Sequence, residues 1–245
     1  MTDRIRDLLR KVWLFEALSE EELAKLERKA VRQSFARHAE VVHQNDNEDT
    51  KLYCVVRGHL KVTTSDPKVD RGEGLLLNLL KAGDHIGEIA LLDGAPRSAS
   101  VVAMDSVELL SISRADFFET LKISHDPADM RLKLMRTMAK RIRLLSERVQ
   151  DCASLPVPAR LAKRLNELAD THGDRIDAKR VLFKIKLSQQ DLGDLVQATR
   201  ESVNKCMRQL VAEQIVGRER GRILIIDRLR LQLKAQPPGL QIAHG

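Results

Sequence analysis

The most informative stretch of this chain reads Gly87-Glu88-Ile89-Ala90-Leu91-Leu92-Asp93-Gly94-Ala95-Pro96-Arg97-Ser98-Ala99. Arg97 offers a planar fork of donors that suits a phosphate, and Ser98 adds a hydroxyl. A helical turn after Gly87 would present free N–H groups to the same anion. Glu88 is an acceptor suited to a ribose hydroxyl, as acidic residues are in dinucleotide sites. The stretch therefore predicts a nucleotide-sized site with one phosphate clamp and one sugar clamp. No Mg²⁺-binding cluster, nucleophile–base pair or metal-ligand spacing accompanies it, so binding is favoured over an enzyme activity.

The sequence around this site is typical of a β-barrel or sandwich. Helices are predicted at 19–29, where Ser19 and Glu22 form a capping box, and at 114–122. A turn is predicted at Ser65-Asp66-Pro67. Short strand-like runs separated by turn residues occur at 52–56, 60–64, 75–80, 99–104 and 107–112.

A long helix is predicted over 127–152. One of its faces carries apolar residues at alternating steps of three and four, which is a heptad pattern. Two interpretations stay open, an intramolecular core helix and a parallel coiled coil with a second copy, and the second is favoured. The run Leu155-Pro156-Val157-Pro158 then forms a hinge, and the next helix spans 158–171 and ends at Gly173. The predicted dimer seam consists of Met135, Met138, Ile142, Leu145, Val149 and Cys152.

Residues 188–211 are typical of a helix-turn-helix. Ser188 can cap the first helix, Gln197-Ala198 can form the turn, and Thr199 can cap the second helix. A hairpin with an Arg-rich tip follows over 216–226, so the prediction is a winged helix. The start of the second helix would enter the major groove of DNA, with the hairpin tip near phosphates. The residues predicted to face DNA are Ser188, Gln189, Thr199, Arg200, Glu201, Ser202, Asn204, Lys205, Arg208 and Arg220.

Composition limits the classes of function. The 245 residues include 42 Lys plus Arg and 35 Asp plus Glu, a net charge of +7. Residues 1–125 carry −3, 126–150 carry +4 and 151–245 carry +6, so the basic rear of the chain suits a polyanion. Aromatic residues make up only 3% of the chain, which argues against a base-stacking platform for single strands. No apolar run is long enough to cross a membrane and no secretory signal is seen, so a cytoplasmic location is expected.

The cysteines and histidines do not predict a metal site. Cys54, Cys152 and Cys206 are odd in number and far apart, which argues against a disulfide framework and a four-thiolate site. Four scattered histidines are expected at surface or turn positions: His38, His43, His59 and His85.

The stretch from Gly87 to Ala99 closely resembles the phosphate-binding cassette of cyclic-nucleotide-binding domains. With the long helix and the run Arg200-Glu201-Ser202-Val203-Asn204-Lys205, the chain resembles the CRP/FNR family of bacterial transcription factors over about residues 10–230. The resemblance implies an α+β fold with a β-roll or jelly-roll domain at 1–125, a dimerisation helix at 126–153 and a winged helix-turn-helix at 154–235. It also implies a homodimer that binds double-stranded palindromic DNA, acts with RNA polymerase and responds to cAMP or cGMP.

The resemblance assigns roles to individual residues. Glu88 would hold the ribose 2′-hydroxyl, and Arg97 and Ser98 the cyclic phosphate. The family touches the purine from the long helix, where Leu145 and Ser146 stand at positions that carry two hydroxyls in the enteric member. Because a leucine cannot hydrogen-bond, discrimination among bases is expected to be weaker or to use other groups. The remaining residues assigned to the ligand site are Gly87, Ile89, Ala90, Ala99 and Arg141.

Other interpretations remain open at this level. The same fold could respond to cyclic di-GMP or act without a ligand, and a nucleotide-sensing module could act on a protein partner instead of DNA. The Arg-tipped hairpin and Arg200-Glu201 favour DNA. The absence of cysteines before Cys54 argues against the iron–sulfur branch of the family.

Overall fold

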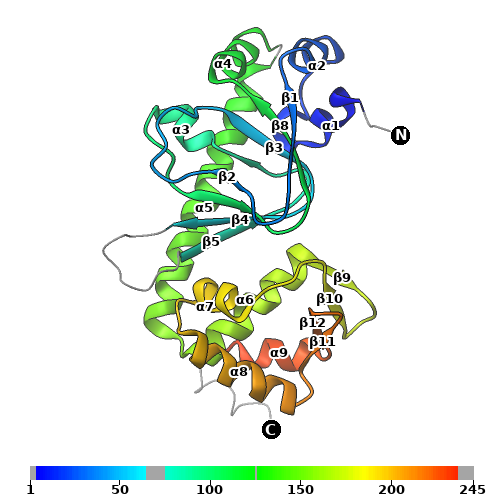
Figure 1. The fold of residues 1–245 in the computed structure, drawn as a ribbon, viewed down its shortest axis with the longest axis vertical. Coiled ribbons are helices and arrows are strands. Elements are labelled where there is room, and N and C mark those ends of the chain that lie inside the picture. The colour runs from blue at the N-terminus through cyan, green and yellow to red at the C-terminus, as the bar shows by residue number, and fades with distance from the viewer. Residues whose placement is uncertain (1–3, 65–74, 125, 237–245) are drawn as a thin grey trace. The chain divides into compact units, whose positions relative to one another are not determined.

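The chain folds into two compact units, Met1–Ile142 and Arg143–Gly245, in the computed structural model shown in Figure 1. The structure describes residues 4–64, 75–124 and 126–236, so the turn predicted at 65–67 lies outside the described residues. The boundaries predicted after residues 125 and 153 lie close to the ends of the long helix α5 (Pro127–Ser154), whereas the two compact units divide inside that helix.

The first unit contains two four-stranded antiparallel sheets. One sheet has the order β1 (Val31–Phe35), β8 (Val107–Ile112), β3 (Leu52–Arg57) and β6 (His85–Ile86). The other has the order β2 (Glu40–Val42), β7 (Ser100–Ala103), β4 (Leu60–Thr64) and β5 (Leu75–Leu80). This architecture confirms the predicted β-rich fold. The pairing of Tyr53 with Ile86 places β3 beside the start of the cassette.

Strands β3 and β8 are buried on both faces, which explains their nearly continuous apolar sequence. Alternate residues of a strand point to opposite faces. Val55 and Leu109 therefore pack toward the second sheet, in one cluster with Leu60 and Val101.

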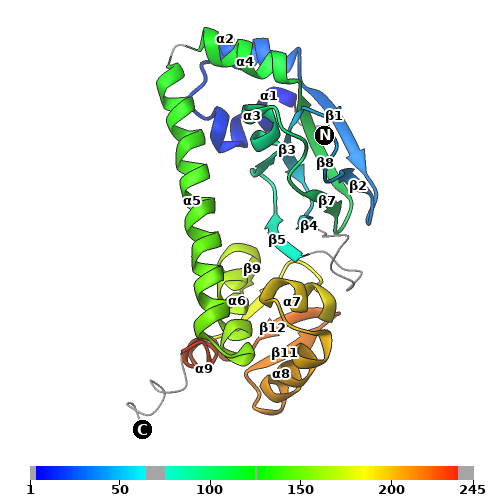
Figure 2. The same cartoon turned by 90° about the vertical axis from the view of Figure 1, so that its left-hand side faces the viewer.

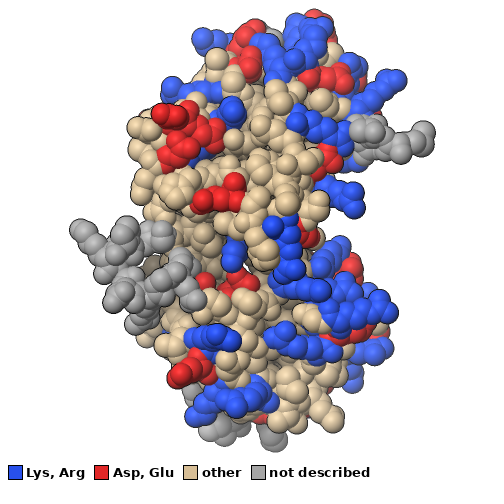
Figure 3. Space-filling model, viewed as in Figure 1, with Lys and Arg blue, Asp and Glu red and all other residues tan. Residues whose placement is uncertain are grey.

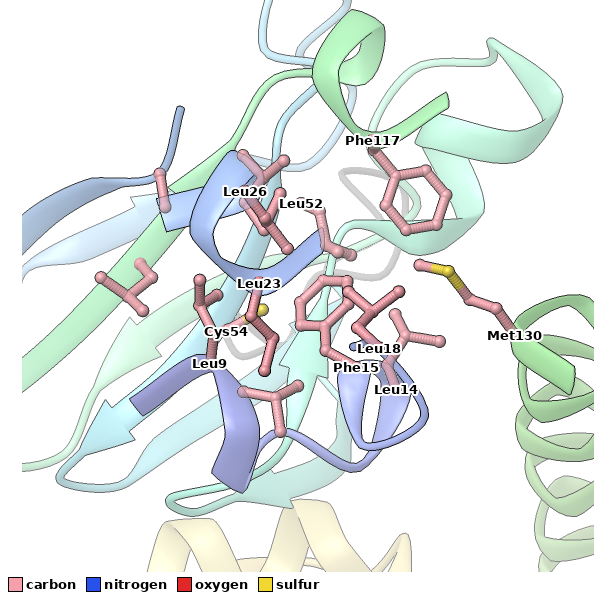
Figure 4. Packing of buried hydrophobic residues seen from close by; sticks show 14 of the residues in the cluster. Leu9, Leu14, Phe15, Leu18, Leu23, Leu26, Leu52, Cys54, Phe117 and Met130 are labelled. Atoms are coloured by element: carbon pink, nitrogen blue, oxygen red, sulfur yellow. The ribbon is translucent and has the colours of Figure 1, made fainter. Parts of the chain in front are cut away.

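The opposite face of these strands meets helices, as Figure 4 shows. Leu52 and Cys54 of β3 pack against α1 (Ile5–Lys11), η1 (Trp13–Phe15), α2 (Glu20–Glu27), α4 (Arg114–Ile123) and the start of α5. Each fully buried Leu or Phe contributes roughly 1.5–3 kcal/mol through burial. The predicted capping box of α2 is confirmed, because the Glu22 N–H donates to Ser19 Oγ and the Ser19 N–H donates to Glu22 Oε2.

The second unit is a winged helix, with strands and helices as seen in Figures 1 and 2. After α5 ends at Ser154, α6 (Val157–His172) begins with Pro156 as its N-cap, and the helix ends before Gly173 as predicted. The sheet order is β11 (Val216–Glu219), β12 (Arg222–Ile225), β10 (Val181–Phe183) and β9 (Gly173–Arg175). The remaining helices are α7 (Gln189–Val196), α8 (Arg200–Ala212) and α9 (Arg228–Lys234). None of the helices in the described ranges combines the length and apolarity that crossing a membrane requires.

Candidate functional site

Arg97 is the centre of the cassette and is almost fully buried, with 2% of its surface exposed. Its guanidinium donates to the carbonyl oxygen of Lys51 at 2.6 Å and to that of Gly87 at 3.1 Å, and it pairs with Asp49 Oδ2 at 2.9 Å. The Tyr53 hydroxyl donates to the same carboxylate oxygen at 3.0 Å, and the Tyr53 ring centre lies 5.8 Å from the guanidinium carbon. These contacts fix the position of the guanidinium plane.

Gly87 is required by this arrangement. Its φ of 91° is in the left-handed region, which favours glycine. A Cβ at this position would lie 2.3 Å from Arg97 Nη1 and 2.5 Å from the Lys51 carbonyl oxygen. The glycine therefore allows Arg97 to reach the backbone just before α3 (Glu88–Asp93).

Glu88 is the second buried charged group of the cassette, with 1% of its surface exposed. It forms an ion pair with Arg141 of α5, which also donates to the carbonyl oxygen of His85 at 3.3 Å. Burial raises the pKa of Glu88, while the neighbouring Arg141 and Arg97 act in the opposite direction. The structure thus brings Arg141, which the resemblance assigns to the ligand site, to the cassette.

Two buried atoms of the cassette lack a hydrogen-bond partner among the described residues. They are Nε of Arg97, a cationic donor, and Oε2 of Glu88, an acceptor. Leaving a buried donor or acceptor unpaired costs about 1–3 kcal/mol. A ligand that carries both an anionic oxygen and a hydroxyl could satisfy the two atoms together, so the residues present fit a cyclic nucleotide.

The other predicted ligand residues are distributed around this pair. Ser98 and Ile89 are exposed, whereas Ala90 and Ala99 are buried. Leu145 and Ser146 are exposed residues of the second compact unit, and their contact with a base stays a prediction.

Sequence reasoning missed the residues that hold Arg97. Asp49 and Tyr53 are 48 and 44 positions away from it in the chain, and tertiary contacts bring them together, including a hydrogen bond from the Arg97 N–H to the Asp46 carbonyl oxygen at 2.8 Å. The one available signal is the spacing of Asp49 and Tyr53, an acid four residues before the chain's single tyrosine, and it is weak.

The prediction that His85 lies at the surface is wrong. His85 is only 3% exposed, because β6 pairs it with the buried Cys54 and its ring centre lies 6.1 Å from that of Trp13. Neither ring nitrogen has a hydrogen-bond partner within the described residues. Burial lowers the pKa of His85 to about 4, so the imidazole is neutral near pH 7. His38 and His43 are exposed, as predicted. His59 is partly exposed, and its Nδ1 lies 2.7 Å from Asp105 Oδ2.

The helix-turn-helix is formed as the sequence predicted. Ser188 Oγ accepts the N–H of Asp191 at 3.0 Å and Thr199 Oγ1 accepts the N–H of Ser202 at 3.2 Å, so both helices have side-chain caps. Gly193 allows the close turn, because a Cβ there would lie 2.8 Å from the carbonyl oxygen of Ala198.

The outer face of α8 is polar and basic, and its inner face is buried. Val203, Met207 and Leu210 pack inward, as predicted. The predicted DNA-facing residues Arg200, Glu201, Lys205 and Arg208 are exposed, Gln189, Ser202 and Asn204 are partly exposed, and Ser188 and Thr199 are exposed caps. One concave surface is lined by residues of both helices and of the wing, including Gln189, Asn204, Arg208 and Arg218.

The wing ends in a tight basic turn. Arg220 and Gly221 connect β11 to β12 and both have positive φ, 50° and 80°, as a two-residue type I′ turn requires. On the face shown in Figure 3, Lys and Arg side chains gather over the sheet of the second unit. This concentration of positive charge suits a polyanion.

Comparison with known proteins supports both the nucleotide-binding cassette and the helix-turn-helix. The model of the cyclic nucleotide-binding domain matches residues 32–124, and that of the Crp-like helix-turn-helix domain matches residues 159–233. The cAMP-activated global transcriptional regulator CRP of Salmonella typhimurium is 31% identical over 183 residues, which are 72% of this chain and 80% of that protein. The CRP-like cAMP-activated global transcriptional regulator of Mycobacterium tuberculosis is 26% identical over 230 residues, 94% of this chain and 99% of that protein.

Solved structures show the same fold. A CooA variant from Carboxydothermus hydrogenoformans has a TM-score of 0.72 at 18% identity, covering 94% of this chain and 95% of that one. The c-di-GMP responsive regulator CLP of Xanthomonas campestris has a TM-score of 0.68 at 18% identity, covering 84% and 99%.

A nucleotide cassette in a β-rich domain, a long helix and a winged helix together define a nucleotide-binding transcription regulator. This chain belongs to the CRP/FNR family and is a cyclic-nucleotide-binding transcription regulator of that family.

Proposed function

We propose that this chain is a homodimeric transcription factor that reads palindromic DNA and is gated by a cyclic mononucleotide, with cAMP favoured over cGMP. The observation that carries the proposal is that one cassette holds two unpaired buried atoms, the donor Nε of Arg97 and the acceptor Oε2 of Glu88. The two relatives described above are named as cAMP-activated, which supports cAMP as the effector. The cassette offers one buried arginine, which suits one phosphate better than the two of cyclic di-GMP.

The residues divide the ligand between them. Arg97 and Ser98 would bind the cyclic phosphate, and Glu88 would accept from the ribose 2′-hydroxyl. Because Glu88 is also the ion-pair partner of Arg141, a ligand at Glu88 changes the surroundings of a side chain on α5. A ligand shifts a regulator only by its differential affinity for two states, and couplings of about 1–3 kcal/mol are typical.

The exposed apolar face of α5 supports a dimer. Met135, Ile142, Leu145 and Val149 of the predicted seam are 66%, 65%, 49% and 70% exposed in the single chain. Apolar residues that recur at heptad spacing along one helix face are stabilised by a second helix that covers them. A homodimer would also place two α8 helices on half-sites about one turn of DNA apart.

Calorimetry on the full chain with cAMP, cGMP and cyclic di-GMP tests the ligand class. We expect cAMP to bind at one site per chain. Tight binding of cyclic di-GMP with no binding of cAMP would replace the proposed effector, and binding of none of the three would remove the gating proposal and leave a regulator that acts without ligand.

Leu145→Thr should sharpen the preference for cAMP over cGMP. A hydroxyl at this position could hydrogen-bond the base, and a site built to hydrogen-bond its ligand discriminates more strongly than an apolar one. The measurement is the ratio of the two dissociation constants in the variant and in the wild type. Leu144→Thr is the matched control, because Leu144 is an exposed leucine outside the predicted seam. An equal ratio in Leu145→Thr and wild type contradicts the role given to Leu145.

Arg200→Ala should cut the affinity for specific duplex by about 1–3 kcal/mol without affecting the dimer. Arg200 is exposed in the first turn of α8, and an arginine fork can contact guanine O6 and N7. The run Arg200 to Lys205 resembles the recognition residues that read TGTGA-like half-sites in the family. The measurement is therefore a gel shift with a duplex that carries two inverted TGTGA half-sites, compared with a scrambled duplex. Arg230→Ala, which removes an arginine of α9, controls for charge. If Arg200→Ala prefers the specific duplex as strongly as the wild type does, the first turn of α8 does not contact the bases as proposed.

RNA polymerase is the further protein partner that we propose, and the cytoplasm is the proposed location, since both follow from action on bacterial promoters.

The competing function is a nucleotide sensor that acts on a protein. Affinity for duplex DNA that falls steeply as the salt concentration rises supports the DNA-binding function, because phosphate contacts release counterions.

A further inference from the structure

One arginine joins the end of the long helix to the turn of the helix-turn-helix. Arg160 lies in the first turns of α6, and among the described residues its guanidinium donates to four backbone carbonyl oxygens. On the α5 side, Nη1 lies 2.9 Å from the Leu155 oxygen and 3.4 Å from the Cys152 oxygen. On the α7 side, Nε lies 3.1 Å from the Val196 oxygen and Nη2 lies 3.4 Å from the Gln197 oxygen. We call these five residues the Arg160 junction.

The chemistry of helix ends explains why an arginine occupies this position. The last carbonyls of a helix have no N–H partner within it and carry a partial negative charge. Two such ends, those of α5 and α7, converge on one side chain. The guanidinium is planar and presents five N–H donors in a fixed geometry, so it can serve both ends at once. A lysine ammonium is a compact charge and cannot span them in the same way.

A second contact joins the same two elements. The Cys152 thiol donates to Gln197 Oε1 at 3.3 Å, so both the side chain and the backbone of Gln197 are bound to the junction. Gln197 is the C-cap of α7 and has a φ of 53°, in the left-handed region. Thr199, which caps the recognition helix α8, follows only two residues later. The position of Gln197 therefore sets where α8 begins.

The end of α5 is also attached rigidly to α6. Asp151 is 6% exposed and accepts from Arg164 at 3.0 Å and from Lys163 at 2.7 Å, both on α6. A buried ion pair of this kind is costly to break, because removing one partner leaves the other charge unpaired. The last turn of α5 and helix α6, which carries Arg160, are thus held together independently of the junction.

We propose that Arg160 is the positioning residue that fixes the recognition helix relative to the C-terminal end of α5, so that an effector-induced change in α5 reaches the DNA-reading surface. Arg160 itself touches neither effector nor DNA in this scheme. The proposal rests on the proposed function, because its readout is the effect of a cyclic nucleotide on DNA binding.

The test compares Arg160→Gln and Arg160→Lys with the wild type as full chains. Affinity for a duplex with two inverted TGTGA half-sites is measured by fluorescence anisotropy, without nucleotide and with saturating cAMP. The wild-type ratio of the two affinities is expected to be about 5–150. In Arg160→Gln the ratio should fall to about 2 or less, and in Arg160→Lys it should fall to an intermediate value, while the affinity for cAMP by calorimetry stays within about twofold of the wild type.

Arg230→Gln is the matched control, because it removes an arginine of the same unit whose Nη1 also donates to a carbonyl, that of Glu213. It should keep the wild-type ratio. A wild-type ratio in Arg160→Gln overturns the proposal, and so does an equal loss in Arg230→Gln, since the effect would then be one of charge alone. If Arg160→Gln does not give a cooperative thermal transition, Arg160→Lys is the deciding variant. A wild-type ratio in Arg160→Lys then overturns the proposal.

Failure of the proposed function gives a different pattern. If the wild type binds the duplex with the same affinity with and without cAMP, the gating proposal fails. The role of Arg160 is then tested by the affinity for the duplex without nucleotide. Arg160→Gln must lower that affinity at least tenfold relative to Arg230→Gln. A smaller loss overturns the role of Arg160. A wild-type protein that binds this duplex under neither condition contradicts the DNA-reading proposal, and the role of Arg160 with it.

Discussion

Arg97→Ala should abolish cyclic nucleotide binding, lowering the affinity by about 100-fold or more. Hydrogen bonds to a charged group contribute roughly 1.5–3 kcal/mol each, and the arginine fork is expected to make two of them to the cyclic phosphate. The substitution also leaves Asp49 without its ion-pair partner, although the Tyr53 hydroxyl still donates to it, so an uncompensated carboxylate would face the incoming anion. Both effects weaken binding, and the second adds repulsion to the loss of attraction.

Calorimetry with cAMP measures this effect, and Arg114→Ala is its matched control. Arg114 also lies near the cassette, donates to the Leu91 carbonyl at 2.9 Å and has its guanidinium carbon 5.4 Å from the Phe118 ring centre, yet it is not assigned to the ligand. Arg114→Ala should bind cAMP within a few-fold of the wild type. Retention of tight binding by Arg97→Ala would show that the cassette assignment is wrong, provided that the thermal transition shows a folded protein.

Val149→Asp should convert the dimer to a monomer and lower the affinity for palindromic DNA by about 100-fold or more. Val149 is 70% exposed in the single chain, on the face that carries the heptad pattern. In a parallel coiled coil it would meet its own copy, so the substitution places two carboxylates in an apolar seam. Loss of the dimer removes the simultaneous engagement of two half-sites, which is worth 10²–10⁴ in affinity for linked modules.

Sedimentation at several protein concentrations reads the oligomeric state directly. Gln150→Asp introduces the same carboxylate at the next, exposed position, outside the seam, and should remain dimeric. A dimer of unchanged stability in Val149→Asp would show that α5 does not form the subunit contact, and the exposed apolar face would then need another explanation.

The elements with strong local signals could be predicted from sequence. The capping boxes at Ser19 and Ser188 and the cap at Thr199 place helix starts at the correct residues, because a cap is a local interaction over three positions. The cassette was recognisable because Gly87, Glu88 and Arg97 lie within one short stretch. The glycine is explained by a close approach that forbids any side chain there.

The elements that were not predicted depend on distant partners. Strand β1 carries mostly polar residues and Val31 is 57% exposed, so it has no apolar alternation, and its pairing with β8 defines it. Strand β6 has two residues, and its pairing with β3 is what buries His85. The contact of Asp49 with Arg97 likewise depends on two loops that are distant in the chain and hydrogen-bonded to each other.

Neighbouring side chains orient the two buried charged groups of the cassette, Arg97 and Glu88, before a ligand binds. Asp49 and Tyr53 hold Arg97, and Arg141 holds Glu88, so the two groups that we propose bind the ligand are already oriented. Orienting groups before binding reduces the entropy that the ligand must otherwise offset. The cation and the carboxylate nevertheless each retain one unpaired buried atom, which a phosphate and a hydroxyl would satisfy.

The central claim is that a cyclic nucleotide and DNA bind to coupled sites of one chain. The most direct test is the affinity of the wild-type protein for the TGTGA duplex across a cAMP titration, together with the affinity for cAMP with and without that duplex. Coupling between binding sites is reciprocal, so cAMP should tighten DNA binding by about 5–150-fold and the duplex should tighten cAMP binding by the same factor. A DNA affinity that stays constant from zero to saturating cAMP would contradict the claim.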